Sequence, residues 1–366
     1  MGSQPQKTPL YETHQKWGAK IVDFHGWLMP IQYEGIVKEH HTVREKVGLF
    51  DICHMGEIWV EGEKAQAFLQ RVLTNDVSKM NVGQCLYSPM CRPDGGIVDD
   101  TVSYKFSQNK FLLVVNASNI DKDFDWLTQN NLEKVALKNK SAQTGLLALQ
   151  GPLAVKVYEK LFGKTLEAIE YYHFIETELN GVSLIVSRTG YTGEKGVEIF
   201  CQAENVVWLW EELMKAGAEF GIAPIGLGAR DTLRLEMKFA LYGNDITDET
   251  NPIEAGLGWT VALDKSDFIG KTALVQAGQK KEGRRLVCFQ LQDPGIARHG
   301  FKVWNETHPI GEVTSGTLSP VLNKSIGMAY VDLAHAKVGS LINVEVRSKK
   351  LKATVVKPPF VPNKTK

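Results

Sequence analysis

The C-terminal part of the chain has the pattern that most restricts the fold. From residue 281 onward, short β-prone runs follow one another with turn residues between them: LVCFQL, KVW, IGEVTSG, SIGMAYV, LINVEV and ATVVK. Short strands at close intervals are typical of a small barrel or sandwich. The charged, glycine-containing stretch QKKEGRR at 279–285 is a candidate linker. The sequence therefore predicts an all-β, barrel-like C-terminal domain over residues 281–366.

The preceding 280 residues mix helical and strand patterns. Apolar residues recur at helical spacing in four segments, 36–47, 65–73, 153–161 and 206–214, whereas 110–119 and 144–150 have the composition of buried strands. These segments do not form a regular strand–helix repeat, and the chain has no G-x-G-x-x-G after a first strand and no phosphate-binding P-loop. We therefore predict an α+β fold with mostly antiparallel sheets.

Charge and composition argue against several classes of function. Lys+Arg and Asp+Glu both number 42, so the chain lacks the basic excess that is typical of nucleic-acid binding. No apolar run approaches the roughly 20 residues of a membrane helix, and the N-terminal residues lack the apolar region of a signal peptide. The five cysteines are odd in number and form no C-x-x-C, which favours buried thiols in a reducing compartment. We expect a cytoplasmic protein without a nucleic-acid or membrane partner.

Four segments contain polar residues in positions that are unusual for a structural role alone: 51–60, 87–104, 187–199 and 224–243. In the second, Pro-Asp-Gly-Gly predicts a tight hairpin, and Asp99 and Asp100 follow it at the start of a strand. Neighbouring side chains of a strand point to opposite faces, so one carboxylate faces inward, where it needs a partner or a task. Each segment also has an ordinary explanation, such as a structural His54 or an ion pair of Arg234 with Asp231 or Glu236. No single segment identifies a reaction.

The motifs taken together resemble the T-protein family of the glycine cleavage system. The resemblance extends from about residue 8 to about 361 and includes TPLYETH, VDFHGWLMP, VREKVGLFDICHMGE, LTNDV, DGGIVDDTV, VVNASNIDKD, LALQGP, VSRTGYTGEKGVEIF, GLGARDTLRLE, LYGNDI, NPIEAGLGW, VTSGTLSP and KPPF. Cys53 stands where the family usually has serine before His-Met-Gly, and a thiol is the weaker hydrogen-bonding group.

The resemblance implies a three-domain cloverleaf around a central folate channel. Residues 1–46 with 143–280 would form a discontinuous α+β folate-binding domain, 47–142 a second α+β domain, and 281–366 the β-barrel-like domain. It also implies a tetrahydrofolate-dependent aminomethyltransferase. The one-carbon unit would pass from the S-aminomethyl-dihydrolipoyl arm of lipoylated H-protein to tetrahydrofolate, giving 5,10-methylenetetrahydrofolate, ammonia and dihydrolipoyl H-protein. Tetrahydrofolate would be the co-substrate, and no metal, flavin or pyridoxal phosphate is implied.

The resemblance also assigns site residues. Asp100 matches the catalytic aspartate, whose carboxylate would orient folate and stabilise developing positive charge. Glu198 matches a pteridine contact that accepts two hydrogen bonds. Further folate-binding positions are matched by Tyr87, Val102, Tyr104, Asn116, Tyr191 and Arg230. With Asp100 facing the channel, strand alternation places Val102 and Tyr104 on the same face and Asp99 on the opposite one, where neutralising it should hardly affect turnover. Arg298 matches a region where the family meets H-protein or its arm.

Three alternatives stay open at this point. A folate-dependent demethylase would use the same fold, and donor specificity depends on a few channel residues. A non-catalytic iron–sulfur maintenance protein would carry a K-G-C-Y-x-G-Q-E type segment, whereas residues 188–194 read RTGYTGE without a cysteine. A folate-binding scaffold without turnover is the third possibility, and the presence of Asp100 weighs against it.

Overall fold

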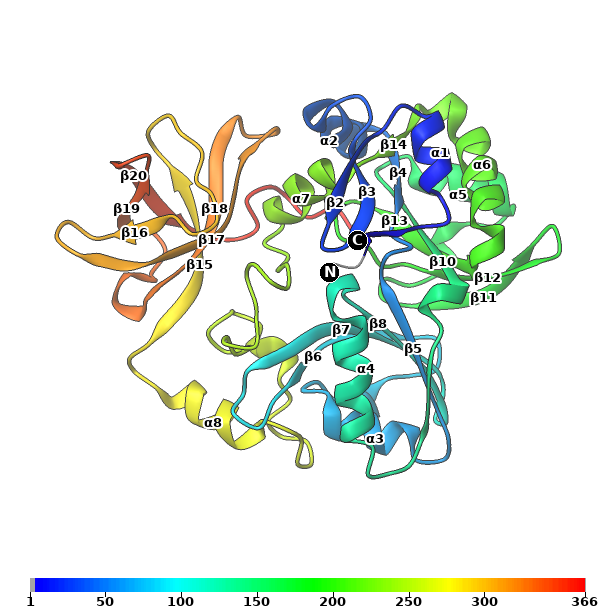
Figure 1. The fold of residues 1–366 in the computed structure, drawn as a ribbon, viewed down its shortest axis with the longest axis horizontal. Helices are drawn as coiled ribbons and strands as arrows, with labels where there is room; N and C mark the ends of the chain where they lie inside the picture. Colours follow the sequence, from blue (N-terminus) through cyan, green and yellow to red (C-terminus); the bar gives the residue numbers. More distant parts are fainter. Residues whose placement is uncertain (1–3, 366) are drawn as a thin grey trace.

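The largest sheet of the computed structural model has six strands in the order β11-β12-β13-β10-β4-β14 (Figure 1). The structure describes residues 4–365. The strands of this sheet are β4 (Val47–Asp51), β10 (Thr144–Gln150), β11 (Phe174–Leu179), β12 (Val182–Ser187), β13 (Gly196–Gln202) and β14 (Ile222–Ile225). One face packs against α5 (Ala154–Phe162) and α6 (Val206–Gly217). The other packs against α2 (Ile36–Glu45) and α7 (Leu227–Glu236).

The N-terminal elements lie beside α7. Helix α1 (Tyr11–Lys16) is followed by a three-stranded sheet in the order β1-β3-β2, formed by β1 (Gln6–Lys7), β2 (Lys20–Phe24) and β3 (Trp27–Gln32). Strand β3 contacts α7. This arrangement brings the N-terminal residues against the helix that carries Arg230.

A second sheet has five antiparallel strands in the order β6-β7-β8-β5-β9. They are β5 (Gly56–Glu61), β6 (Cys85–Cys91), β7 (Ile97–Ser107), β8 (Lys110–Val115) and β9 (Ala136–Asn139). Helices α3 (Ala65–Val72) and α4 (Ile120–Gln129) cover one face. The opposite face shares an apolar core with the six-stranded sheet, in which Tyr104 of β7 meets Phe200 of β13. The predicted hairpin at 93–96 joins β6 to β7, and Gly95 there has φ +88°, a conformation that favours glycine.

The C-terminal strands form a closed barrel in the order β15-β18-β17-β16-β19-β20. Their bounds are β15 (Arg284–Leu291), β16 (Lys302–Trp304), β17 (Pro309–Ser319), β18 (Lys324–Asp332), β19 (Leu341–Val346) and β20 (Lys349–Val356). Helix α8 (Lys271–Gln279) precedes the barrel (Figure 1). The barrel and the α+β architecture with mostly antiparallel pairing are thus confirmed. Among residues 4–365, the parallel pairs of named strands are β1 with β3 and β4 with β14.

The division into three domains stays a prediction. Strand β4 pairs with β10 and β14 and therefore belongs to the six-stranded sheet, although it begins at residue 47. This pairing favours a first boundary after Asp51.

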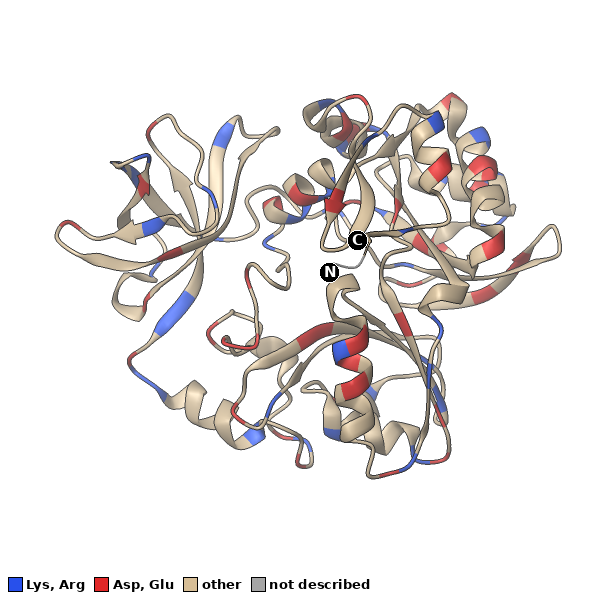
Figure 2. Ribbon diagram, viewed as in Figure 1, with Lys and Arg blue, Asp and Glu red and all other residues tan. Residues whose placement is uncertain are grey.

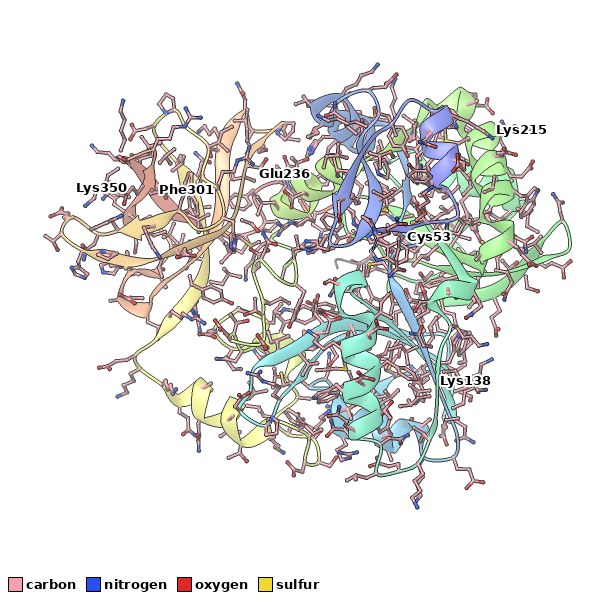
Figure 3. The ribbon with its side chains drawn as sticks, in the orientation of Figure 1. Cys53, Lys138, Lys215, Glu236, Phe301 and Lys350 are labelled. Atoms are coloured by element: carbon pink, nitrogen blue, oxygen red, sulfur yellow. The ribbon has the colours of Figure 1, made fainter. Side chains whose placement is uncertain are left out.

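Buried polar side chains join the barrel to α7. Arg234 of α7 pairs with Asp245 at 2.5 Å and donates to Ser315 of β17 at 2.8 Å. At the C-terminal end of the same helix, Glu236 accepts a hydrogen bond from Ser319 at 2.5 Å. Figure 3 shows Glu236 on the side of α7 that faces the barrel. These contacts are fully buried, so they fix the barrel against the helix that also carries Arg230.

All five cysteines lie within the described residues, and each is buried with a free thiol. Cys53 donates to the carbonyl of Leu146 and accepts from its amide, both at 3.3 Å, so the thiol anchors the turn after β4 to β10 (Figure 3). Within residues 4–365, no helix is both long enough and apolar enough to cross a membrane.

Candidate active site

The Asp100 carboxylate is held by partners from both neighbouring strands. The Tyr87 hydroxyl on β6 donates to Oδ2 at 2.9 Å, and Nδ2 of Asn116, which follows β8, donates to Oδ1 at 2.8 Å. Val102 lies two residues along the same strand and pairs with Tyr87 on one side and with Val114 on the other. The structure therefore brings four of the predicted site residues together on one face of the five-stranded sheet.

Asp99 lies on the opposite face of β7, as alternation predicts, but it is not isolated from this group. Its carboxylate is fully buried and accepts hydrogen bonds from the amide and Nδ2 of Asn116, at 2.9 and 2.8 Å. Nδ2 of Asn119 donates to it as well, at 2.8 Å. Asn116 therefore connects the two neighbouring carboxylates.

The surroundings of Asp100 change its acidity. Burial, followed by the negative charge of Asp99, raises the pKa of Asp100 to about 7, although the hydrogen bonds from Tyr87 and Asn116 act in the opposite direction. Burial and the Asp100 charge raise the pKa of Tyr87, which therefore stays a hydrogen-bond donor at neutral pH. A carboxyl group of this acidity is able to change its charge at neutral pH.

Glu198 of β13 lies at the end of a chain of hydroxyl groups. Thr189 donates to its Oε2, and Ser187 lies 2.7 Å from the Thr189 hydroxyl. The hydroxyl of Tyr104 on β7 lies 3.4 Å from that of Ser187. Burial raises the pKa of Glu198, against the effects of Thr189 and of Arg230. Tyr104 therefore connects the five-stranded sheet to the polar group around Glu198.

Tyr191 and Arg230 form the third part of the site. The Arg230 guanidinium lies 4.8 Å from the centre of the Tyr191 ring, a cation–π arrangement. The Tyr191 ring also stacks on Phe239 at 5.6 Å, and its hydroxyl donates to the carbonyl of Ala240. These contacts hold the Tyr191 ring against Phe239 and beside the Arg230 side chain of α7.

Two aromatic residues that no motif singles out belong to the same region. Burial raises the pKa of Tyr172, and the neighbouring Tyr171, Glu198 and Asp100 raise it further. This side chain therefore lies within electrostatic range of both carboxylates. Trp259 stacks on Tyr87 with ring centres 5.9 Å apart, yet 71% of it is exposed. NPIEAGLGW contains this tryptophan, but nothing in the motif shows that it reaches Tyr87.

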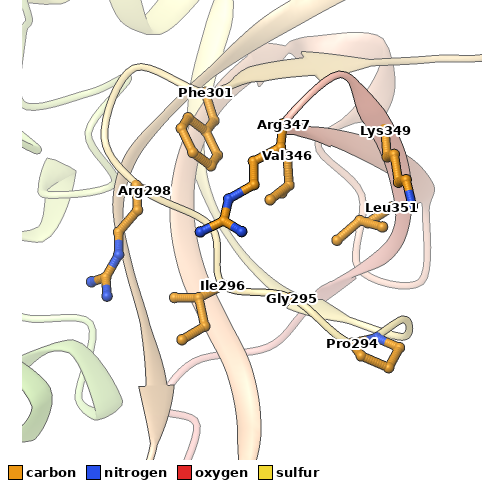
Figure 4. A pocket seen from close by; sticks show the side chains of 9 residues that line it. All are labelled: Pro294, Gly295, Ile296, Arg298, Phe301, Val346, Arg347, Lys349 and Leu351. Carbon is orange, nitrogen blue, oxygen red and sulfur yellow. The ribbon is translucent and has the colours of Figure 1, made fainter.

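Arg298 lies apart from these residues, on the barrel. It lines a pocket of about 460 Å³ together with Pro294, Gly295, Ile296, Phe301, Val346, Arg347, Lys349 and Leu351. Figure 4 shows the Arg347 guanidinium in the middle of the lining side chains, with Phe301 above it and Arg298 at the edge. None of the eight predicted catalytic and folate-binding residues lines it.

Comparison with known proteins covers almost the whole chain. Residues 10–265 match the family model of the GCVT N-terminal domain, and residues 284–362 match that of the glycine cleavage T-protein C-terminal barrel domain. An aminomethyltransferase of Halothermothrix orenii is 48% identical over 97% of this chain and 100% of the relative. One of Caldanaerobacter subterraneus is 49% identical over 96% of this chain and 94% of the relative. The crystal structure of glycine cleavage system aminomethyltransferase T from Bartonella henselae superimposes with a TM-score of 0.93, at 36% identity and 99% coverage of both chains.

Proposed function

This chain belongs to the glycine cleavage T-protein family and is an aminomethyltransferase, and from this premise we propose its donor, its acceptor and the residues that act on them. The donor is the S-aminomethyl-dihydrolipoyl arm of H-protein. The acceptor is tetrahydrofolate. The products are 5,10-methylenetetrahydrofolate, ammonia and dihydrolipoyl H-protein.

Two carboxylates support this assignment. One lies on the five-stranded sheet and the other on the six-stranded sheet, where the two sheets pack together. Asp100 is held by Tyr87 and Asn116, and Glu198 is held by Thr189. The Thr189 hydroxyl occupies Oε2 of Glu198, which leaves Oε1 to accept from the donor groups of a pteridine. The donors and acceptors of this region therefore fit a folate.

Tetrahydrofolate supplies the two nitrogen atoms, N5 and N10, that receive the carbon. Glu198 would orient the pteridine through charge-assisted hydrogen bonds, and Arg230 would donate to a folate oxygen. Asp100 would lie near N10, where its negative charge stabilises the positive charge that develops as ammonia leaves. Tyr87 and Asn116 would keep that carboxylate in position during the reaction.

The names of the relatives and the similarity over nearly the full length favour aminomethyl transfer over demethylation.

The assay is incubation of the purified protein with aminomethyl-loaded H-protein and tetrahydrofolate. We expect ammonia and methylenetetrahydrofolate in equal amounts, and neither product with H-protein that lacks the lipoyl group. Turnover of N-methylated amines with no turnover of loaded H-protein would instead identify a demethylase.

A further inference from the structure

A second layer of acidic residues lies behind Asp100, between β7 and α4. Asp123 of α4 and Asp99 of β7 are both 0% exposed. Neither oxygen of Asp123 accepts a hydrogen bond from an N–H or O–H donor of residues 4–365, but its carboxyl group lies within hydrogen-bond reach of that of Asp99. Figure 2 shows the acidic part of β7 beside the acidic first half of α4. Two buried carboxyl groups in contact cannot both be ionised without a large cost, so a proton lies between them.

The hydrogen bonds show which of the two groups carries this proton. Asp99 accepts three N–H donors, two from Asn116 and one from Asn119, and these stabilise its charged form. No such donor reaches Asp123 from the described part of the chain. Burial, and then Asp99, raise the pKa of Asp123 far above its usual range. The Asp123 O–H therefore donates to the Asp99 carboxylate.

Lys122 does not neutralise this pair directly. Its Nζ donates to the carbonyl of Val98 at 2.6 Å and to the hydroxyl of Tyr242 at 2.8 Å. Its charge acts on both aspartates at longer range. The pair therefore keeps one negative charge, which is located on Asp99.

We propose that Asp99 and Asp123 share one proton and form a buried, singly charged pair that positions Asp100 through Asn116 and determines when Asp100 is ionised. This proposal rests on the proposed catalytic role of Asp100. Asp99 and Asp123 are positioning residues in it, because they act on Asp100 and not on the substrate.

The geometry allows Asp99 to act on Asp100 in two ways. Nδ2 of Asn116 has two hydrogen atoms, one directed at Oδ1 of Asp99 and the other at Oδ1 of Asp100, both at 2.8 Å. Asp99 thus fixes the amide that holds Asp100. Its negative charge also contributes to the raised pKa of Asp100. Neutralising Asp99 should therefore alter turnover, and this inference replaces the sequence-based expectation that Asp99 is dispensable.

The pH dependence of Asp100 has several titratable neighbours. They are Tyr87 from β6, Asp99 from its own strand, Asp123 from α4, and Tyr172 and Tyr191 from the opposing sheet and its loops. Burial keeps the pKa of each tyrosine above its usual value, so these groups stay neutral in the range where Asp100 titrates. Asp123 stays protonated in the same range. Among these neighbours, Asp99 is therefore the charged group that adds to the effect of burial on Asp100.

The test compares the pH profiles of kcat for Asp99→Asn and Asp123→Asn in the full-length protein with loaded H-protein. The wild type should lose activity as the pH falls through about 7. Asp99→Asn should move this acidic limb down by about one pH unit or more, the scale of removing a neighbouring like charge. Asp123→Asn should leave the limb unchanged, because a neutral amide replaces a neutral acid and still donates to Asp99. The reverse result, or no shift in either variant, would overturn the proposal.

A second measurement does not depend on turnover or on pH profiles. The infrared difference spectrum between the wild type and Asp123→Asn at neutral pH should contain the C=O stretching band of a protonated carboxylic acid. A carboxylate band in its place would overturn the shared proton. If the wild type fails to turn over loaded H-protein but the acid band is present, the proposed function fails and the carboxyl pair stands. If turnover is normal and the band is absent, only the pair fails.

Discussion

Asp100 and Glu198 are both carboxylates with raised pKa values, yet their surroundings differ. A second carboxylate lies behind Asp100, and its charge adds to the effect of burial on the pKa. Glu198 is surrounded by hydroxyl groups and is within range of the positive charge of Arg230. The first environment allows a group to change its charge in the reaction, and the second keeps a fixed acceptor in place. The two residues should therefore respond differently to the same loss of charge.

Asp100→Asn should reduce kcat by about 10²–10³-fold, the scale of removing one preorganised electrostatic contact. The affinity for folate should change less, because the neutral amide keeps its size and can still hydrogen-bond. The measurement is steady-state ammonia release with loaded H-protein at saturating tetrahydrofolate. A variant with normal kcat and weakened folate binding would assign Asp100 to binding alone.

Glu198→Gln should mainly weaken folate binding. Loss of a charge-assisted hydrogen bond costs about 1.5–3 kcal/mol, which corresponds to roughly a 10- to 150-fold loss of affinity. Calorimetric titration with tetrahydrofolate measures this directly. Glu178→Gln is the matched control, because Glu178 is exposed on β11 of the same sheet and should bind folate normally. Equal affinities for both variants would remove Glu198 from the site.

Some features of the site follow from local sequence patterns, whereas others depend on tertiary contacts. Strand alternation correctly separates Asp99 from Asp100, because it depends only on local backbone geometry. The sharing of Asn116 by the two carboxylates depends on where β8 ends relative to β7, and no local pattern contains that information. Tyr172 was missed for a similar reason, since its φ of +61° and its approach to both sheets arise from tertiary contacts.

A buried ion cluster joins helices α2 and α7 to the loop before β13. Arg44 of α2 pairs with Glu236 of α7 at 2.7 Å and with Glu194 at 3.0 Å, and it donates to the carbonyl of Thr192 at 2.7 Å. The loop that contains Thr192 and Glu194 leads from Tyr191 into β13, which carries Glu198. The cluster thus positions the loop between Tyr191 and Glu198, two residues of the proposed folate site.

Glu236→Ala should destabilise the fold by about 3–5 kcal/mol, because it leaves the buried Arg44 without its main partner. Denaturant unfolding measures the loss. Lys160→Ala is the matched control. It breaks the exposed ion pair with Glu219, whose worth should be at most about 1 kcal/mol. If both variants lose the same stability, the cluster contributes no more than a surface pair.

The positions of the helices could be predicted more readily than the long-range pairing between strands and between charged side chains. The stripes at 36–47, 65–73, 153–161 and 206–214 correspond to α2, α3, α5 and α6. Periodicity reports which face of an element is apolar, and this property is local. The pairing of β4 with β10 joins residues about 100 positions apart. Arg234 pairs with Asp231 on its own helix, as one of the two expected ion pairs, whereas Glu236 pairs with Arg44 of α2. Such long-range choices depend on the packing of the complete chain.

Buried polar contacts attach the barrel to α7 and thereby to the rest of the molecule. Asp245 is completely buried at the centre of the contact: it pairs with Arg234 of α7 and accepts from Thr314 and Ser315 of β17, at 2.6 and 2.7 Å. Its carbonyl accepts from Tyr330 of β18 at 2.9 Å. The side chain of Asp245 thus couples α7 to β17, and its backbone carbonyl adds a contact to β18. Because opening this contact would break the buried ion pair and its hydrogen bonds at the same time, the barrel and the preceding residues should unfold together.

Asp245→Asn tests this coupling. The neutral amide would leave the buried Arg234 guanidinium without the negative charge that is its closest partner. Breaking a buried pair in this way costs about 3–5 kcal/mol. This cost falls on the contact between the barrel and α7 and not on either core, so calorimetry should resolve a separate, lower-temperature transition in the variant and one transition in the wild type. Asp332→Asn, an exposed change on β18, should retain the single transition. A lower but still single transition in Asp245→Asn would show that the cores remain coupled through the surrounding apolar contacts.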